Sequence, residues 1–387
     1  MKKVLFVSQT SFFGGAEIVL CDYLNDSIND IQSYLITTNK DGIRKKYELM
    51  LSKSNTKIYS YRSLKQISIR KKPIRALIYL FFTIYHIHKV IKKEQIDILY
   101  GNNSVDMLAI TLYKKFLNKN IIIIQHIHDI LQRKMYLRFI EKYDYLIDAY
   151  IVPSKAGKNS FVNYIKNPNK ISVVYNGVSI VNNCKNFNKV EFCHKYSIPY
   201  NKKIIVFIGQ IIHRKRLDLF IDIVKELNKI SNRYFGVIIG DSDIENLYFK
   251  EQLYRLDNNF KYLGKISRDI LMKEIYPAID FFLLTSDRDP FPTVILEAMG
   301  NGAVVISRKV DGVSELISDG IDGILWNYNA NISEIIEKIY FIMNDERKII
   351  DIKIKAKEKI KEKYNSLNKV KVINKLINDL YLRKNEK

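Results

Sequence analysis

Short runs rich in valine and isoleucine recur along the whole chain, and longer amphipathic segments separate them. Runs that are apolar on both faces are typical of strands buried in a parallel sheet. In the first half they are Val4–Val7, Tyr34–Thr37, Lys57–Tyr61, Ile96–Tyr100, Ile121–Gln125, Ala149–Val152 and Ile171–Tyr175. In the second half they are Ile204–Ile208, Phe235–Ile239, Lys261–Leu263, Phe281–Thr285, Val304–Ser307 and Gly323–Trp326. The alternation predicts an α/β fold in which helices cover parallel sheets.

The chain is long enough for two domains. Its 387 residues exceed one ordinary domain and suit two domains of about 180 residues each. The predicted divisions are a first domain at 1–180, a linker at 181–200, a second domain at 201–360 and a basic amphipathic C-terminal helix at 361–387. The linker prediction rests on the run Asn-Asn-Cys-Lys-Asn-Phe-Asn and on Pro199.

Charge and cysteine content restrict the partners and the compartment. Lysine and arginine number 63 against 41 acids, so the net charge of +22 favours anionic partners such as phosphorylated ligands, acidic membranes or nucleic acid. Cys21, Cys184 and Cys193 form no Cys-x-x-Cys pair, which indicates neither a disulfide framework nor a zinc site and fits the cytoplasm. The N-terminal apolar run is too short for a signal peptide, and no unbroken apolar run predicts a membrane-spanning helix.

One segment concentrates positive charge. Between Leu49 and Lys93 there is no acid, and the basic residues are Lys53, Lys57, Arg62, Lys65, Arg70, Lys71, Lys72, Arg75, Lys89, Lys92 and Lys93. The apolar run Ala76–Tyr85 lies among them and is too short to cross a bilayer. Residues 62–93 therefore suit an element that lies on an anionic membrane surface. A buried domain helix with a solvated basic lead-in is the alternative.

The stretch 284–302 places two acids around a helix start. Asp289 lies in a loop that Pro290 and Pro292 make rigid, and Glu297 follows eight residues later. The predicted helix begins near Thr293 and stops at Gly300-Asn-Gly. Free N–H groups at such a helix start bind phosphate, and carboxylates accept hydrogen bonds from sugar or ribose hydroxyls.

A cationic cluster follows the first strand of the second half. This strand ends at Gly209, and Arg214 and Lys215 open the next helical segment. Cations at a helix N-terminus oppose the helix dipole, so Arg214 and Lys215 would not stabilise the helix there. Ligands of parallel sheets bind outside the carboxyl ends of the strands. The cluster therefore predicts a clamp for a diphosphate.

Two loops of the first half also carry candidate groups. Gly14 and Gly15 lie between the first strand and its helix, but the chain has no G-x-G-x-x-G, which argues against a dinucleotide dehydrogenase. His126 and His128 share one face of a strand end, and Asp129 follows them. A metal pair is possible there, but no third ligand is evident. Asp129 could instead fix the tautomer of the His128 ring.

These motifs, in this order and spacing, resemble the retaining nucleotide-sugar glycosyltransferases of family 4. The resemblance extends from residue 4 to about residue 326, through Gly-Gly-Ala-Glu, Gly-x5-Lys and the acid-x7-acid signature. It implies the GT-B fold: two Rossmann-like domains that face each other across a cleft, with the C-terminal helix crossing back to the first domain. Asp289 stands where the family usually has glutamate, and Gln210 stands where it often has arginine.

The resemblance also implies residue roles, in which the first domain binds the acceptor and the second binds the nucleotide sugar. Implied catalytic residues are His128, Asp289, Arg214 and Lys215. Implied donor-binding residues are Gly14, Gly15, Gly209, Arg214, Lys215, Gly264, Lys265, Asp289, Phe291, Pro292, Thr293, Val294 and Glu297. No metal and no cofactor are expected, because two cations and a helix N-terminus can neutralise the leaving diphosphate.

The expected reaction is transfer of a sugar, with retention, from a nucleotide diphosphate sugar such as a UDP-sugar. The expected acceptor is a lipid-linked glycan of a bacterial capsule, O-antigen or other surface polysaccharide, at the cytoplasmic face of the membrane. A hydrolysing nucleotide-sugar epimerase of the same architecture is an alternative. A basic nucleic-acid-binding protein is another, although the chain has no clustered aromatic-basic recognition motif.

Overall fold

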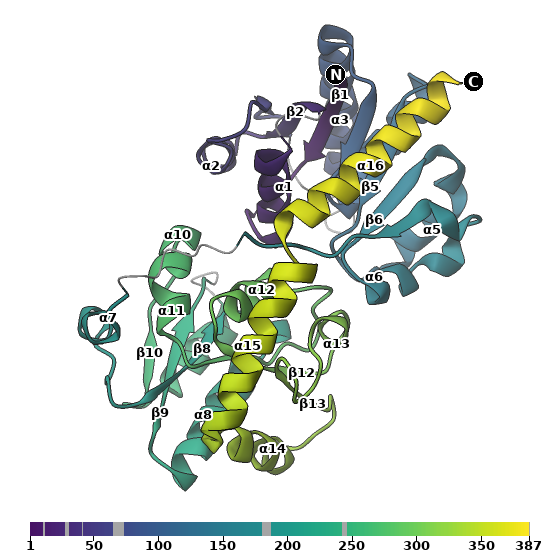
Figure 1. Ribbon diagram of the computed structural model, residues 1–387. Helices are drawn as coiled ribbons and strands as arrows, with labels where there is room; N and C mark the ends of the chain where they lie inside the picture. The colour runs from purple at the N-terminus through teal and green to yellow at the C-terminus, as the bar shows by residue number, and fades with distance from the viewer. Residues whose placement is uncertain are drawn as a thin grey trace. The chain divides into compact units, whose positions relative to one another are not determined.

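The computed structural model divides the chain into two compact units (Figure 1). It describes residues 1–10, 12–27, 31–40, 42–64, 73–179, 187–241 and 246–386. Unit 1 comprises Met1–Asn176 and Ser366–Lys387, and unit 2 comprises Gly177–Asn365. Each unit is built around one sheet, and all pairings within both sheets are parallel.

The sheet of unit 1 has seven strands in the order β3-β2-β1-β4-β5-β6-β7. They are β1 (Lys2–Ser8), β2 (Ile31–Thr38), β3 (Lys57–Tyr61), β4 (Ile98–Gly101), β5 (Ile122–His126), β6 (Ala149–Val152) and β7 (Ile171–Val173). The helices of this part of the chain are α1 (Gly15–Asp26), α2 (Ile43–Met50), α3 (Pro73–Glu94), α4 (Ser104–Phe116), α5 (Lys134–Tyr143) and α6 (Lys155–Asn159). Every strand predicted for the first half is present.

Two apolar layers cover the faces of this sheet, which explains why its strands read as continuous apolar runs. Leu5 and Val7 of β1 join a core that includes Ile87 of α3 and Met107 of α4. The alternate residues Val4 and Phe6 join a second core with residues of α1, α2 and the C-terminal helix α16 (Ser366–Asn385). Since successive strand residues point to opposite faces, helices on both sides require apolar residues throughout.

The sheet of unit 2 has six strands in the order β10-β9-β8-β11-β12-β13. They are β8 (Lys203–Ile208), β9 (Tyr234–Ile239), β10 (Phe260–Tyr262), β11 (Phe281–Leu284), β12 (Val304–Arg308) and β13 (Ile324–Trp326). The helices are α7 (Lys189–Tyr196), α8 (Leu217–Ile230), α9 (Leu247–Tyr254), α10 (Arg268–Ile270), α11 (Tyr276–Ala278), α12 (Thr293–Gly300), α13 (Val313–Leu316), α14 (Ile332–Asn344) and α15 (Glu346–Lys363). The strands predicted for the second half are all found, as is the helix that begins at Thr293.

The predicted linker at 181–200 contains a helix, α7, that belongs to unit 2. Its N-cap Asn188 accepts hydrogen bonds from Val190 and Glu191, and Phe192 and Cys193 are buried. The helix has only eight residues, so its apolar pattern is short. The asparagine-rich run before it therefore favoured the prediction of a linker. Residues 181–186 of the predicted linker lie outside the described part of the chain.

The C-terminal helix α16 packs in unit 1, as the resemblance implied. Its Val370, Ile373 and Ile377 are buried in the core beside β1. It also makes two polar contacts with α1: Asn374 Oδ1 accepts from the Tyr23 hydroxyl at 2.6 Å, and Lys369 Nζ donates to the Val19 carbonyl at 2.8 Å. The helix begins at Ser366, after α15 ends at Lys363, rather than at the predicted residue 361.

We expect Ile373→Ala to destabilise unit 1 far more than Val372→Ala. Ile373 is 1% exposed in the core, whereas its neighbour Val372 is 48% exposed. Removing the buried side chain leaves a cavity and should lower the free energy of unfolding by about 2–5 kcal/mol. The exposed change should stay within about 0.5 kcal/mol. Urea unfolding followed by circular dichroism measures both variants, and equal effects would contradict the placement of α16.

Candidate functional site

The loops at the carboxyl ends of β8, β9, β10, β11 and β12 gather the predicted residues of unit 2. In a parallel sheet these loops lie along one edge, which is where ligands bind in such folds. Gly209 follows β8, Gly264 follows β10, and Asp289 lies in the loop between β11 and α12. The structure therefore brings residues from distant parts of the sequence to one edge of the second sheet.

Three glycines allow these loops to approach one another closely. A Cβ atom on Gly240 would lie 1.9 Å from the Gly209 carbonyl oxygen, so only glycine fits there. The Gly240 amide donates to the Gly264 carbonyl at 2.9 Å, and Gly264 has a left-handed φ of 69°. The sequence predicted Gly209 and Gly264, but not Gly240, because the close contact joins loops far apart in the chain.

Arg216 holds the segment that carries the two predicted cations. It has a φ of 52°, which is an uncommon left-handed conformation for an arginine. The Thr285 hydroxyl donates to the carbonyls of Lys215 and Arg216 at 2.9 and 2.8 Å, and the guanidinium pairs with Asp218 and Asp287. The short spacing Arg-x-Asp at 216–218 could have indicated the pair with Asp218. The second partner of Arg216, Asp287, is distant in the sequence and is seen only in the fold.

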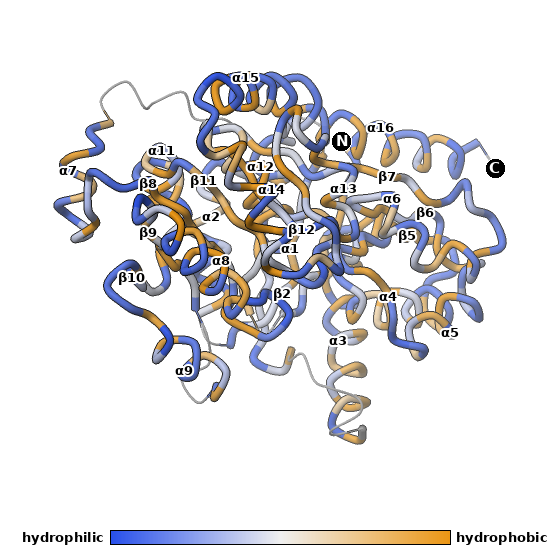
Figure 2. The backbone as a smooth tube through the Cα atoms, turned by 90° about the horizontal axis from the view of Figure 1, so that it is seen from below, coloured by the Kyte–Doolittle hydropathy of each residue, from blue (hydrophilic) through white to orange (hydrophobic). Residues whose placement is uncertain are grey.

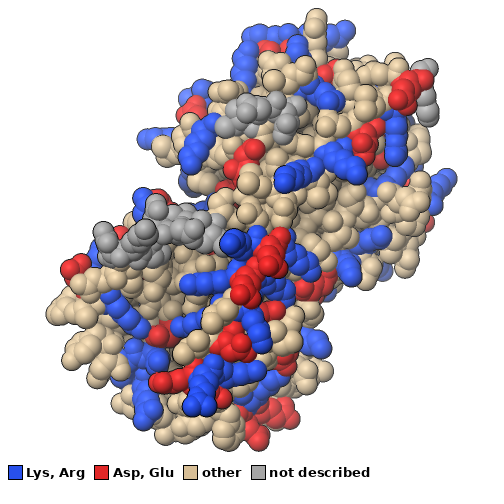
Figure 3. Space-filling view, viewed as in Figure 1, with Lys and Arg blue, Asp and Glu red and all other residues tan. Residues whose placement is uncertain are grey.

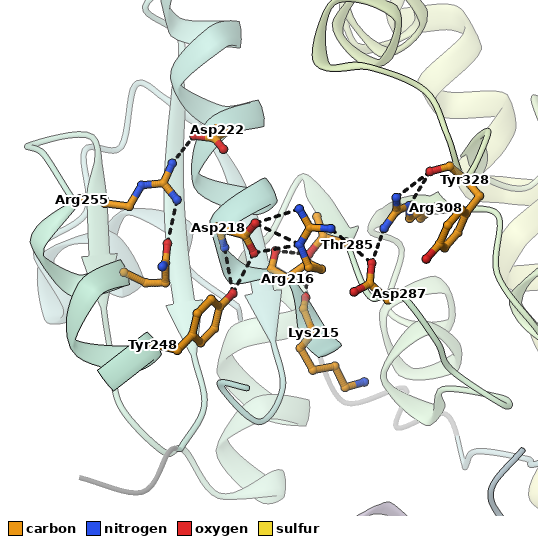
Figure 4. Close-up of polar contacts among 11 residues, drawn as sticks. Lys215, Arg216, Asp218, Asp222, Tyr248, Arg255, Thr285, Asp287, Arg308 and Tyr328 are labelled. Atoms are coloured by element: carbon orange, nitrogen blue, oxygen red, sulfur yellow. Dashed lines mark hydrogen bonds and ion pairs between the residues drawn. The ribbon is translucent and has the colours of Figure 1, made fainter. Parts of the chain in front are cut away.

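Figure 4 shows this network continuing to a second arginine. Asp287 also pairs with Arg308, whose guanidinium carbon lies 3.9 Å from the centre of the Tyr328 ring and whose nitrogens donate to the Tyr328 carbonyl. The loops after β8, β11, β12 and β13 are thereby tied together. The side chain of Lys215 leads away from this network in the same view (Figure 4).

Lys215 and Asp289 form an ion pair that is largely shielded from water. The distance from Lys215 Nζ to Asp289 Oδ2 is 2.6 Å, and the two side chains are 14% and 10% exposed. Buried charges require such pairing, because each would otherwise lose its hydration without compensation. The first acid of the acid-x7-acid pattern is therefore in direct contact with the lysine of the Gly-x5-Lys motif.

Asp311 and Arg214 complete the surroundings of Asp289. The Asp289 amide donates to Asp311 Oδ2 at 3.0 Å, and burial raises the pKa of the Asp311 carboxyl. Arg214 donates to the Arg288 carbonyl at 2.6 Å, and its own carbonyl accepts from the Asp287 amide at 2.9 Å. Both predicted cations thus contact the loop that carries Asp289. Asp311 was not predicted as a site residue.

The helix α12 starts beside this loop, as predicted. Phe291 is buried, and the N-cap is Pro292, which offers no side chain to accept hydrogen bonds from the first turn. Thr293 and Val294 are the first two helical residues and are partly exposed. N–H groups at a helix start without a capping side chain favour an anionic group.

Glu297 lies one turn into α12 and is 4% exposed. Its two carboxylate oxygens accept from Arg268 Nε and from the Tyr276 hydroxyl, each at 2.8 Å. Burial and the adjacent Glu297 charge raise the pKa of Tyr276 well above its usual value. Because a carboxylate can accept about four hydrogen bonds, Glu297 keeps capacity for further hydroxyls. Arg268 and Tyr276 lie 29 and 21 residues away in sequence, and no motif pointed to them.

The predicted residue Lys265 lies at the edge of this group of loops. Its Nζ atom is 2.9 Å from Asp241 Oδ2, and both side chains are about half exposed. The pair therefore connects the loop after β10 with the loop after β9. An exposed pair of this kind contributes little to stability, so it leaves Lys265 able to exchange partners.

In unit 1, the predicted glycines lie at the start of α1. Gly14 is the N-cap, and its amide donates to Glu17 Oε2 at 2.9 Å. Glu17 is buried, and this burial raises the pKa of its carboxyl. A Cβ atom on Gly15 would meet no atom within 4 Å, so the N-terminus of α1 borders open space.

His128 follows β5 and is held by a residue that the sequence did not predict. Its Nε2 atom lies 3.1 Å from Asn102 Oδ1, and its ring lies 3.8 Å from the ring of His126. The sequence indicated Asp129 as the residue that could fix this ring, and the structure adds Asn102 as the partner of Nε2. Burial and the positive charge of Lys369 lower the pKa of His128 to about 3. Among the described residues, no three His, Cys, Asp or Glu side chains form a group that could hold a metal ion.

Comparison with protein families matches both units. The family model described as "Glycosyltransferase Family 4" matches residues 13–181, and the model described as "Glycosyl transferases group 1" matches residues 189–366. The second match covers the loops after β8–β12, and the first covers Gly14, Gly15 and His128.

Two curated relatives and one solved structure illustrate the similarity. The UDP-Gal:alpha-D-GlcNAc-diphosphoundecaprenol alpha-1,3-galactosyltransferase of Escherichia coli is 31% identical over 224 residues, which cover 56% of this chain and 54% of the relative. The capsular polysaccharide biosynthesis glycosyltransferase CapH of Staphylococcus aureus is 25% identical over 211 residues, covering 51% and 55%. The chain thus spans little more than half the length of such relatives.

The structure of Anabaena HepE in complex with UDP and glucose superimposes with a TM-score of 0.81 and 20% identity, over 98% of this chain and 100% of that one. This likeness shows the fold. The two family models follow each other in the order of the two sheets, and together they span most of the chain. The chain belongs to the glycosyltransferases of family 4 and has the GT-B fold of two parallel-sheet α/β domains.

Proposed function

We propose that the protein transfers a sugar from a nucleotide diphosphate sugar, a UDP-sugar, to a hydroxyl group of a glycan, with retention at the anomeric carbon. The observation that carries this proposal is the shielded Lys215–Asp289 pair beside the uncapped start of α12. It places a cation, a hydroxyl-binding acid and free N–H groups together. The presence of UDP and glucose in HepE, and UDP-Gal in the name of the Escherichia coli relative, support the donor class.

Departure of the nucleoside diphosphate is the main electrostatic problem of this reaction. The bond from the anomeric carbon to the phosphate oxygen breaks, and negative charge grows on the diphosphate. Lys215, Arg214 and the start of α12 would stabilise that charge, so that no metal ion and no cofactor are needed. The acceptor oxygen then bonds to the anomeric carbon on the same face, and its proton passes to the leaving phosphate. This front-face route is the one that the family resemblance implies.

The ion pair suggests how donor binding prepares the site. Asp289 is the partner that neutralises Lys215. A bound diphosphate would take over Lys215, because it carries more charge, and Asp289 would become free to accept hydrogen bonds from sugar hydroxyls. Glu297 would accept from the ribose hydroxyls while Arg268 and Tyr276 hold it in place. Gly264 and Lys265 would border the base, and Gly14, Gly15 and His128 would border the transferred sugar.

For the acceptor, we propose a lipid-linked glycan of a bacterial surface polysaccharide, glycosylated at the cytoplasmic face of the membrane. The name of the Escherichia coli relative contains diphosphoundecaprenol, and that of the Staphylococcus aureus relative contains capsular polysaccharide biosynthesis. A lipid-linked acceptor requires an enzyme that stays at the membrane surface. The basic segment 62–93 is the part of the chain that we propose to contact the membrane.

The helix α3 supports this location. Its outer face exposes large apolar side chains at Ile74, Leu77, Ile78, Phe81, Phe82 and Tyr85, with exposures from 38% to 73%. Figure 2 shows the apolar end of α3 leading away from the rest of unit 1. Exposed basic residues occur at Arg75, Lys89, Lys92 and Lys93. The predicted cations Lys65, Arg70, Lys71 and Lys72 lie outside the described residues.

The dimensions of α3 favour insertion into one leaflet. By length and composition alone, Ile74–Glu94 could cross a membrane, although its apolar residues do not form one unbroken run. However, Ile87, Val90 and Ile91 are buried in the core of unit 1. The exposed apolar stretch of about 17 Å, at 1.5 Å per residue, is roughly half of the ~30 Å hydrocarbon core. An exposed apolar face beside cations is typical of an interfacial helix.

Nucleotide release separates the proposed reaction from the alternatives. A glycosyltransferase releases UDP in proportion to added glycan acceptor, an epimerase releases it without acceptor, and a nucleic-acid-binding protein does not release it. On the face shown in Figure 3, basic side chains are spread over both units and mixed with acids rather than gathered into one stripe. Such mixing does not favour nucleic acid, whose binding calls for clustered cations.

We expect Lys215→Ala and Arg214→Ala each to lower acceptor-dependent UDP release by about 10²–10³-fold, because each removes a cation from the developing diphosphate charge. Lys229→Ala is the matched control, since this lysine of α8 is exposed at 71% and lies outside the site. The assay contains EDTA, in which the wild type should remain active. Near-normal activity of both site variants would contradict a role of these cations at the diphosphate. If EDTA abolishes the activity of the wild type and manganese restores it, the reaction requires a metal ion.

Glu297→Gln and Asp289→Asn should affect different parts of the donor. Glu297→Gln should lower the affinity for UDP by about tenfold, since the ribose hydroxyls lose a charged hydrogen-bond acceptor worth roughly 1.5 kcal/mol. Asp289→Asn should spare UDP, or strengthen its binding by leaving Lys215 unpaired, and should weaken only the intact UDP-sugar. Calorimetric titration measures each combination. Parallel losses of both ligands in both variants would contradict the assignment.

The membrane proposal predicts two separable contributions to vesicle binding. Neutralising Arg70, Lys71, Lys72 and Arg75 should reduce binding to anionic vesicles at low salt to the level that the wild type shows at 1 M salt, since each cation near the surface contributes about 1 kcal/mol. Replacing Leu77, Phe81 and Tyr85 by glutamine should also remove the binding that survives at 1 M salt, where charges are screened beyond about 3 Å.

Vesicle flotation measures both contributions. The matched control replaces Leu247, Tyr254 and Phe341, which are exposed at 73%, 89% and 71% in unit 2, and it should float like the wild type. The membrane variants should still glycosylate a short soluble acceptor. If the wild type fails to float at low salt, or the α3 variants float as it does, this segment is an ordinary solvated surface.

A further inference from the structure

A chain of buried polar side chains ends at the ring of His128. The Tyr47 hydroxyl donates to Ser8 Oγ at 2.8 Å, and Asn102 Nδ2 donates to the same oxygen at 3.3 Å. Asn102 Oδ1 lies 3.1 Å from His128 Nε2. Tyr47, Ser8 and Asn102 are all 0% exposed. These residues come from α2, β1 and the loop after β4, so the arrangement depends on the whole sheet of unit 1.

The surroundings of Asn102 determine which way its amide group faces. Besides Ser8, the Nδ2 atom lies 3.4 Å from the carbonyl oxygen of Ala16. A carbonyl oxygen can only accept, so the group facing it must be the NH2 and not the amide oxygen. The oxygen of Asn102 therefore faces His128, and the ring nitrogen opposite it must donate.

This orientation fixes the tautomer of His128. With the proton on Nε2, the neutral ring carries a lone pair on Nδ1. Burial and the charge of Lys369 lower the pKa of the ring, so it is neutral at physiological pH. His128 is partly exposed whereas His126 is buried, and Nε2 of His128 faces the buried Asn102, so Nδ1 is the ring nitrogen that we expect a ligand to reach.

We propose that Asn102 is a positioning residue that sets His128 as a hydrogen-bond acceptor, so that the sugar bound against His128 must present a hydroxyl group to Nδ1. The inference rests on the proposed function for the presence of a sugar, but not for the state of the ring. A site built to pair with one hydroxyl discriminates strongly against a ligand that lacks it, because the ring nitrogen is then left unpaired. A carboxylate at this position would meet a lone pair and be rejected.

The state of the ring can be measured without substrate. In protein labelled with ¹⁵N-histidine, long-range ¹H–¹⁵N spectra distinguish the Nε2–H from the Nδ1–H tautomer, and His128→Gln identifies the signals among the 6 histidines. We expect Nε2–H for His128 in the wild type and a mixture of tautomers in Asn102→Ala. Asn102→Asp keeps an oxygen opposite Nε2 and should keep the proton on Nε2, while its negative charge also favours a second proton on Nδ1.

The control is Ser63→Ala, which removes a hydrogen bond of 2.7 Å to another histidine of unit 1, His86. It should leave the His128 signals unchanged. A wild-type spectrum with the Nδ1–H tautomer overturns the inference, as does an unchanged His128 spectrum in folded Asn102→Ala. Should neither Asn102 variant fold, the wild-type spectrum alone still decides.

Kinetics supply the second readout. For UDP release from UDP-glucose, removing one particular sugar hydroxyl should lower the kcat/KM of the wild type at least tenfold. In Asn102→Ala, the kcat/KM for the complete donor divided by that for the deoxy donor should fall to about twofold. Equal discrimination in wild type and Asn102→Ala would refute the positioning role. Absence of any UDP release would count against the proposed function, whereas the spectra would still test the ring.

Discussion

The need to pair buried charge governs the candidate site of unit 2. Lys215 and Asp289 lie too deep to be well hydrated, so each requires a partner of opposite charge. Their 2.6 Å contact joins the loop after β8 to the loop after β11, across 74 residues of sequence. The supporting network of Arg216, Asp287 and Arg308 keeps both loops in place, although Arg216 must adopt a left-handed conformation to take part. Under the proposed function, a diphosphate would enter a site that is already arranged around a cation.

In unit 1, buried uncharged groups also orient one another, here through hydrogen bonds. The ring of His128 is oriented by Asn102, which is itself oriented by the Ala16 carbonyl at the start of α1. Burial lowers the pKa of that ring, and Lys369 of the C-terminal helix α16 lowers it further. The helix that completes the core of unit 1 therefore also influences the electrostatics of its candidate ligand-binding loop.

Local patterns in the sequence predicted the strands, the helix α12 and the clustering of Gly209, Lys215 and Asp289. Strand period, proline and glycine positions and strand order are local properties, and the carboxyl edge of a parallel sheet brings their loops together. The sequence could not predict hydrogen-bond partners that are distant in the chain and meet only in the folded protein. Arg268 and Tyr276 reach Glu297, Asp311 reaches the Asp289 amide, and Asn102 reaches His128, none of them at a motif spacing. Helix α7 was predicted as part of a linker, because the asparagine-rich composition of this region outweighed the short apolar pattern of the helix.

Under the proposed function, unit 2 recognises a nucleotide through its diphosphate. Calorimetric titration of the wild-type protein with UDP and with uridine, at equal ionic strength, tests it most directly. If Lys215, Arg214 and the start of α12 receive the phosphates, UDP should bind at least a hundredfold more tightly than uridine, since charge-assisted contacts each contribute roughly 1.5–3 kcal/mol. That advantage should shrink as salt is added. Equal affinities for UDP and uridine would contradict the account.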